Sequence, residues 1–125
     1  MTTALIIGGI SFNTMIYVDE FPAPAPGTVF ASNYHETIGS TGAGKALNIT
    51  RLAFDVTLHG LLGDDANGQL IRDYMKSHQV NLITDRDTAG TQRHINWINK
   101  NGERLSFIIN SGTFEPQLDQ SRLNT

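Results

Sequence analysis

Short apolar runs and stretches of helical periodicity alternate along the first half of the chain. Residues 4–7 form a continuous apolar run that ends at Gly8-Gly9, and runs of this length are typical of parallel strands covered on both faces. Helical spacing begins at Lys45, with one apolar stripe formed by Ala46, Ile49 and Ala53. Residues 56–61 read as the next strand. This order predicts a parallel α/β layer with right-handed crossovers.

A second helix is predicted after the Gly-Asp-Asp turn at residues 63–65, where an aspartate can cap the helix. After this turn in the sequence, apolar and aromatic side chains recur at helical spacing and are expected to pack in the core. They are Leu70, Ile71, Tyr74, Met75 and His78.

The pattern then changes to a period of two. Residues 92–99 and 104–109 alternate, and Asn101-Gly102 between them favours a type I′ turn, so an antiparallel hairpin is predicted. Residues 28–38, rich in β-branched and aromatic side chains, predict one or two more strands after a proline-rich loop at 21–27. These segments predict a small second sheet beside the α/β body. Residues 114–125 are polar and show no complete helix or strand pattern.

The composition limits the classes of function. A chain of 125 residues with 39% apolar and 17% charged residues is typical of one ordinary globular domain. Its net charge is −3 and it has no run of Lys or Arg, so neither nucleic acid nor a membrane is an expected partner. The absence of cysteine excludes disulfides, and the four histidines form no close ligand pair, so no metal site is predicted. The N-terminus has no basic, signal-like segment, and a cytoplasmic protein is expected.

The glycine-rich run at residues 39–46 has two interpretations. It satisfies the phosphate-binding pattern G-x-x-x-x-G-K, but Ala46 stands where that motif needs a magnesium-binding hydroxyl. Small residues at a helix N-terminus can also expose backbone N–H groups to an anion or to ligand hydroxyls, or simply allow tight packing of the helix. A nucleotide-binding P-loop is therefore kept as the third hypothesis.

Several motifs in a fixed order resemble the N-terminal part of the ribokinase-like (PfkB) family of carbohydrate and nucleoside kinases. The motifs span about residues 4 to 115. They are Gly8-Gly9 with Asn13, Phe21-Pro22 with Pro26-Gly27, the glycine run followed by Lys45-Ala46-Leu47-Asn48, Gly63-Asp64-Asp65 with Gly68, and Gly102-Glu103-Arg104.

The resemblance implies a single α/β domain, of which residues 1–125 form the N-terminal part, with a parallel-sheet body and a small antiparallel β lid. The lid strands are expected at approximately residues 12–38 and 92–110. The resemblance also implies transfer of the ATP γ-phosphoryl group to a hydroxyl of a sugar or nucleoside, with ATP and magnesium bound mostly by the C-terminal half. The acceptor-binding candidates carried over by position are Ser11, Asn13, Gly39, Ser40, Gly44 and Lys45.

Three candidates depart from the family pattern. Asn13 stands where the family usually has aspartate, Ser40 replaces the second glycine of a pair, and Gly44 stands where a sugar-binding asparagine is common. An amide offers one acceptor group and one donor group, whereas a carboxylate only accepts. Lys45 could pair with an acidic or phosphorylated substrate, or point to solvent.

The family's catalytic aspartate belongs to a Gly-x-Gly-Asp segment in the C-terminal half, and this sequence has no such segment. No catalytic residue is therefore assigned, and the 125-residue chain alone is expected to be inactive. A parallel sheet cut after its early strands leaves an unpaired edge, so a homo-oligomer through the lid or this edge is expected. The second hypothesis is a truncated, non-catalytic module that binds a sugar, a nucleoside or a partner protein.

Overall fold

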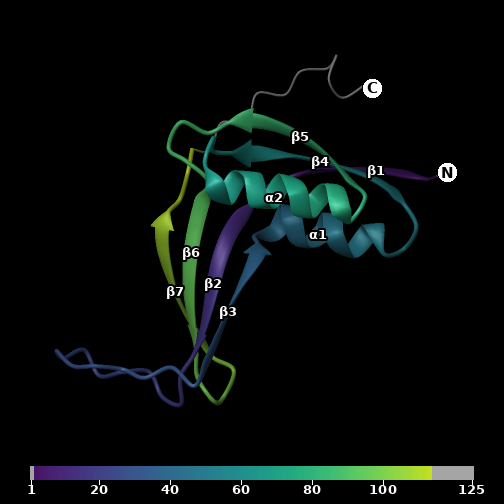
Figure 1. Cartoon of the computed structure of the whole chain (residues 1–125). Coiled ribbons are helices and arrows are strands. Elements are labelled where there is room, and N and C mark those ends of the chain that lie inside the picture. The colour runs from purple at the N-terminus through teal and green to yellow at the C-terminus, as the bar shows by residue number, and fades with distance from the viewer. Residues whose placement is uncertain (1, 114–125) are drawn as a thin grey trace.

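The computed structural model describes residues 2–113, which form two sheets that meet at one corner (Figure 1). The first sheet has the order β1-β4-β5 and is entirely parallel. Its strands are β1 (Thr3–Ile7), β4 (Asp55–Leu62) and β5 (Val80–Arg86). Two helices, α1 (Thr41–Thr50) and α2 (Ala66–Ser77), pack on one face of it. Their buried side chains join those of β4 in a single core cluster, which includes Ala46, Leu58, Leu62, Ile71 and Met75.

The second sheet has the order β3-β2-β6-β7. It consists of β2 (Ser11–Tyr17), β3 (Asn33–Gly39), β6 (Gln92–Ile98) and β7 (Arg104–Asn110). Both outer pairs are antiparallel, whereas β2 and β6 are parallel. The parallel pair arises because β2 and β6 each continue outward from a strand of the first sheet, β1 and β5 respectively. The α/β class with a small second sheet is thus confirmed, and the central pairing of that sheet differs from the antiparallel expectation.

Helix α1 begins and ends earlier than the sequence pattern predicts. It starts at Thr41 rather than Lys45, because its first turn packs directly on the Gly8-Gly9 segment, where the Ala43 N–H donates to the Gly9 carbonyl at 3.1 Å. It ends at Thr50, and Ala53 is exposed with a φ of 64°, so the prediction that Ala53 continues the apolar stripe is wrong.

The turn between β6 and β7 is wider than the predicted type I′ turn. A type I′ turn needs a positive φ at both central residues, but only Gly102 of the Asn-Gly pair has one, at 78°. The Asn99 side chain organises the turn instead, because its Oδ1 accepts from the N–H groups of Asn101 and Glu103, each at 3.0 Å. The hairpin itself is confirmed.

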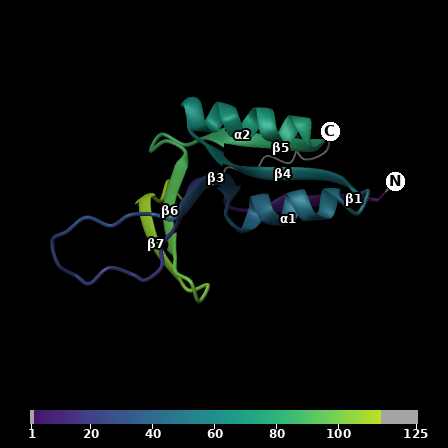
Figure 2. The same ribbon diagram turned by 60° about the horizontal axis from the view of Figure 1, so that its bottom comes forward.

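Other differences concern elements that the pattern did not resolve. Residues 28–32 form no strand and belong to a long loop at the far end of the second sheet (Figure 2). Strand β5 was not predicted, because polar residues interrupt its apolar run. On α2, Ile71 and Met75 are buried as expected, whereas Leu70, Tyr74 and His78 are exposed. No helix among residues 2–113 is long and apolar enough to cross a membrane. The prediction for residues 114–125 lies outside the described residues.

Candidate functional site

Three segments that connect the second sheet to the first sheet and its helix α1 meet at one junction. The chain passes from β1 to β2 through residues 8–10, from β3 to α1 through Ser40, and from β5 to β6 through residues 87–91. This junction lies at the carboxyl ends of the parallel strands β1 and β4, where open α/β sheets bind their ligands. It is therefore the candidate functional site.

A chain of side-chain hydrogen bonds crosses the junction. The Ser40 hydroxyl donates to Ser11 Oγ at 2.8 Å, and the Ser11 hydroxyl donates to Asn13 Oδ1 at 2.7 Å. Ser11 is fully buried and Asn13 is 8% exposed. A side chain at Gly39 would collide with the Asn13 amide, so this glycine makes room for it. The structure thus brings together four predicted acceptor residues: Ser11, Asn13, Gly39 and Ser40.

Ser40 holds an unusual backbone conformation. Its φ of 72° and ψ of 163° fall in a region that is essentially restricted to glycine. It stands at the N-cap of α1, yet its side chain makes no capping bond and is directed to Ser11 instead. Strain of this kind is typical of functional sites and costs about 1–3 kcal/mol.

We expect Ser40→Gly to unfold at a higher denaturant concentration than Ser40→Ala. Both variants lose the hydroxyl that contacts Ser11, but only glycine relieves the backbone strain, so their unfolding free energies should differ by about 1 kcal/mol or more. Urea unfolding of the two variants measures this difference. Equal stabilities would show that Ser40 is unstrained.

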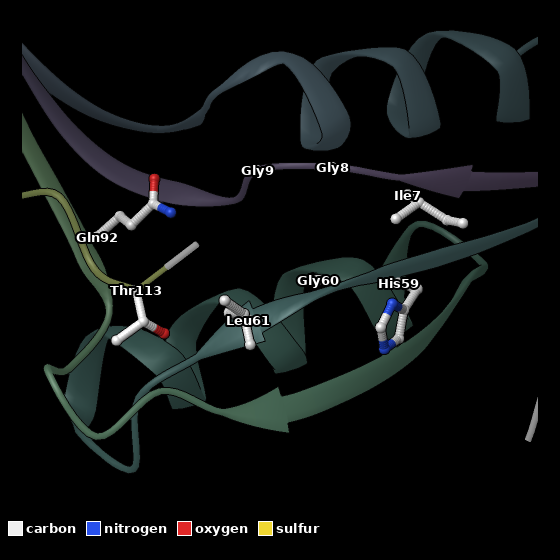
Figure 3. A pocket seen from close by; sticks show the side chains of 8 residues that line it. All are labelled: Ile7, Gly8, Gly9, His59, Gly60, Leu61, Gln92 and Thr113. Atoms are coloured by element: carbon white, nitrogen blue, oxygen red, sulfur yellow. The ribbon is translucent and has the colours of Figure 1, made fainter. Parts of the chain in front are cut away.

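A cavity of about 190 Å³ lies close to this hydrogen-bonded chain. None of the three bonded residues lines it, but the lining residue Gly9 lies against Ser40, and the lining residue Gln92 is opposite Ser11 on β6. Figure 3 shows it between the Gly8-Gly9 segment and the end of β4, with Gln92 and Thr113 on the side of the second sheet. Gly8, Gly9 and Gly60 line the cavity, and neighbouring protein atoms fill the space that their side chains would take, so these glycines allow its walls to pack closely. One wall is the fully buried His59 side chain, whose Nε2 lies 3.2 Å from Asp85 Oδ2.

Gly44 and Lys45 lie in α1 and do not join the side-chain hydrogen bonds of this cluster, although the Gly44 N–H donates to the Ser40 carbonyl at 3.1 Å. Lys45 is exposed and lines a different hollow, together with Thr41 and the end of β1. Since residues 41–44 are already helical, they do not form the open loop that cradles phosphates in a P-loop. The geometry therefore argues against the nucleotide-binding P-loop hypothesis.

Three further polar residues face the site from β6, and the sequence analysis missed them. In the parallel pairing of β2 with β6, Ser11 is opposite Gln92, Asn13 is opposite His94, and Met15 is opposite Asn96. Directly opposite residues share one face of a sheet. No signal in the sequence shows which strand pairs with β2, so these residues could not be assigned beforehand.

The environment of His94 favours its neutral form. Burial lowers the pKa of His94 below 6.5, and the nearby positive charge of Arg104 lowers it further. A neutral imidazole has one donor nitrogen and one acceptor nitrogen. At neutral pH, His94 can therefore both donate to and accept from a hydroxyl group.

Known proteins resemble this chain over most of its length. It is 31% identical over 105 residues to the acarbose 7(IV)-phosphotransferase of Actinoplanes sp., a match that covers 84% of this chain but 35% of that protein. A microbiome-derived acarbose kinase superposes with a TM-score of 0.83 at 26% identity, over 97% of this chain and 41% of the other. Ribokinase of Arabidopsis thaliana, complexed with ribose and ATP, has the same fold, with a TM-score of 0.75 at 19% identity over 99% and 42% of the two chains.

The chain thus spans about a third of the length of its curated relative. The pfkB family of carbohydrate kinases matches residues 1–124, nearly the whole sequence. The predicted resemblance is confirmed, and the chain belongs to the pfkB carbohydrate kinase family.

Proposed function

We propose that this chain supplies the acceptor-binding part of a kinase that transfers the ATP γ-phosphoryl group to a hydroxyl of a saccharide. The observation that carries the proposal is the Ser40–Ser11–Asn13 hydrogen-bonded chain beside the cavity at the carboxyl ends of β1 and β4. The names of the relatives, acarbose and ribose kinases, favour a sugar over a nucleoside.

The chemistry of the cluster suits a hydroxyl ligand. The Asn13 amide provides donor and acceptor groups, and its Oδ1 is held in place by the Ser11 hydroxyl. A fixed amide can orient one sugar hydroxyl without the cost of ordering a mobile side chain. Orientation of the acceptor is the main contribution that a protein makes to phosphoryl transfer.

The second sheet is proposed to act as a lid over the bound sugar. Within residues 2–113 its connections to the first sheet and its helices lie at the junction, and its four strands are hydrogen-bonded to one another, so it can move as one unit. Closure of such a lid would exclude water and limit hydrolysis of ATP. Among residues 2–113 no three His, Asp or Glu side chains are grouped as a metal ion would require. No step is therefore assigned to magnesium.

Self-association is proposed from the apolar side chains that the described part of the chain exposes. Leu5 and Ile7 on β1 are 48% and 47% exposed, and Ile109 on β7 is 61% exposed. Exposed apolar residues on edge strands favour pairing with another sheet or chain.

We expect Asn13→Ala to raise the KM for the saccharide about tenfold, because it removes a hydrogen-bonding group worth about 1.4 kcal/mol. The KM for ATP should not change. The measurement is steady-state ADP release by the gene product at its full length, with Asn48→Ala on the exposed face of α1 as the matched control. An unchanged saccharide KM would contradict the role of Asn13. Stabilisation by a saccharide without ADP release would favour the non-catalytic binding module.

A further inference from the structure

One face of the second sheet continues the acceptor site away from the junction. Every second residue of β2 points to the same side of the sheet, namely Ser11, Asn13, Met15 and Tyr17. The residues opposite them on β3 and β6 lie on that side as well. We name this side the acceptor face. Phe12 and Ile38, on the other side of the sheet, pack against the core cluster that includes α1 and α2, so the described helices leave the acceptor face uncovered.

The middle of the acceptor face is polar and ordered by hydrogen bonds. Ser106 Oγ donates to Asn96 Oδ1 at 2.6 Å, and Asn96 Nδ2 donates to the Met15 sulfur at 3.3 Å. His94, opposite Asn13, adds an imidazole. The reverse side carries Trp97 and Phe107, which pack edge to face, and also Thr14, whose hydroxyl accepts from Arg93 at 2.7 Å. The hydrogen-bonding groups of Asn13, His94 and Asn96 suit a ligand rich in hydroxyl groups.

The far end of the acceptor face carries a pair of stacked rings. The rings of Tyr17 and His35 lie 5.7 Å apart between centroids, with 27° between their planes. Aromatic rings with a polar tip combine a flat apolar surface with hydrogen-bonding capacity, which suits the apolar face and the rim hydroxyls of a sugar ring. This pair is separate from the cluster at Asn13.

The spacing of these two groups sets the size of the ligand. Asn13 and Tyr17 are four residues apart on one strand, a separation of roughly 13 Å. One sugar ring is too small to contact both, whereas two or three joined rings reach from one to the other.

We propose that the acceptor face binds a saccharide of at least two rings, with the reacting ring at Asn13 and a second ring against Tyr17 and His35. This inference rests on the proposed function, since it assumes that Asn13 holds the ring that is phosphorylated. It identifies Tyr17 and His35 as specificity-determining residues that lie away from the reacting hydroxyl.

The test is ADP release by the gene product at its full length with glucose, maltose and maltotriose, which differ in the number of rings. For the unmodified protein, kcat/KM should increase at least tenfold from glucose to the longer sugars. Tyr17→Ala should raise the KM for maltose and maltotriose about tenfold and leave the KM for glucose within about twofold. The matched control is Tyr34→Ala, an aromatic substitution next to His35 on the opposite side of β3, where the ring is 68% exposed.

The outcomes separate the two proposals. Equal kcat/KM for all three sugars, with no effect of Tyr17→Ala, would overturn the two-ring inference and leave the kinase function intact. Equal effects of Tyr17→Ala and Tyr34→Ala would also overturn it, because the effect would not depend on the acceptor face. Ribose is assayed beside them: ADP release with ribose alone would overturn the two-ring inference and leave the kinase function intact, whereas ADP release with none of the four sugars would contradict both.

Discussion

A single methyl group at Gly42 is expected to lower the free energy of unfolding by about 3 kcal/mol, the upper range for overpacking a filled interior. A Cβ at this position would lie 2.7 Å from the Gly8 carbonyl carbon and 2.8 Å from the Gly9 oxygen. Both are backbone atoms that no side-chain rotation can move. Gly42→Ala must therefore displace α1 from the Gly8-Gly9 segment and lengthen the Ala43 N–H···O bond to Gly9.

Gly44→Ala provides the matched control within the same helix. A Cβ at Gly44 meets no atom within 4 Å, and alanine is favoured over glycine inside a helix by about 0.5–1 kcal/mol. Urea unfolding should therefore show that Gly42→Ala is less stable, and Gly44→Ala slightly more stable, than the unmodified protein. Equal midpoints for the two variants would contradict the close packing of Gly42 on Gly8.

Replacement of Asp65 by alanine should cost about 2 kcal/mol, because it removes a helix cap and leaves a buried threonine without its acceptor. Asp65 Oδ1 accepts from the Gly68 N–H at 2.8 Å and from the Thr91 hydroxyl at 2.6 Å, and Oδ2 accepts from the Thr91 N–H at 2.8 Å. Thr91 lies on the crossing from β5 to β6 and is 4% exposed. One carboxylate therefore joins the start of α2 to the residue that directly precedes β6.

The same contacts make the stabilisation of the fold by Asp65 depend on pH. Partial burial acts to raise the pKa of Asp65, but hydrogen bonds from Thr91 and Gly68 and the charge of Arg72 outweigh it and hold the pKa below 3.8. A carboxyl with a lowered pKa in the folded state stabilises the fold above its unfolded pKa, and this stabilisation is lost as the pH falls through the folded pKa. The stability difference between the unmodified protein and Asp65→Ala should therefore shrink in acid below pH 3.8.

Asp64→Ala is the control, since Asp64 is the exposed neighbouring carboxylate, and it should change stability by less than about 0.5 kcal/mol. Chemical unfolding at neutral and at acidic pH measures both variants. A loss of stability in Asp64→Ala as large as in Asp65→Ala would show that general charge, rather than the bonds to Thr91 and Gly68, is responsible.

Local sequence signals predicted the features that depend on neighbouring residues. The Asp65 cap follows from the Gly-Asp-Asp turn before a helical pattern, and the structure confirms it. The start of α1 could not be predicted in the same way, because contacts of Gly42 with the distant Gly8 override the tendency of glycine to form turns. The wide turn at residues 99–103 likewise depends on a side chain, Asn99, whose competing hydrogen bonds are not visible in the Asn-Gly pair.

Some residues of the candidate site were predicted from the sequence and others were not, and the difference has a physical basis. Ser11, Asn13 and Ser40 could be named from the resemblance to the family, and the structure joins them by hydrogen bonds. His94 and Asn96 could not be named, because their place beside β2 depends on a parallel pairing between segments far apart in the sequence. Pairings of this kind are set by the tertiary fold rather than by local pattern.

The distance between the junction and the far end of the second sheet has an evolutionary consequence. Residues 18–32 and 99–103 connect strands at that far end (Figures 1 and 2), whereas the Ser40–Ser11–Asn13 chain lies at the opposite end of the same strands. Insertions and deletions are tolerated best in surface connections, and of these two loops only residues 18–32 adjoin Tyr17, whose carbonyl accepts from the Ser32 N–H at 2.8 Å. Among relatives of this chain, the two distal loops can therefore change length and composition while the geometry at Asn13 is retained.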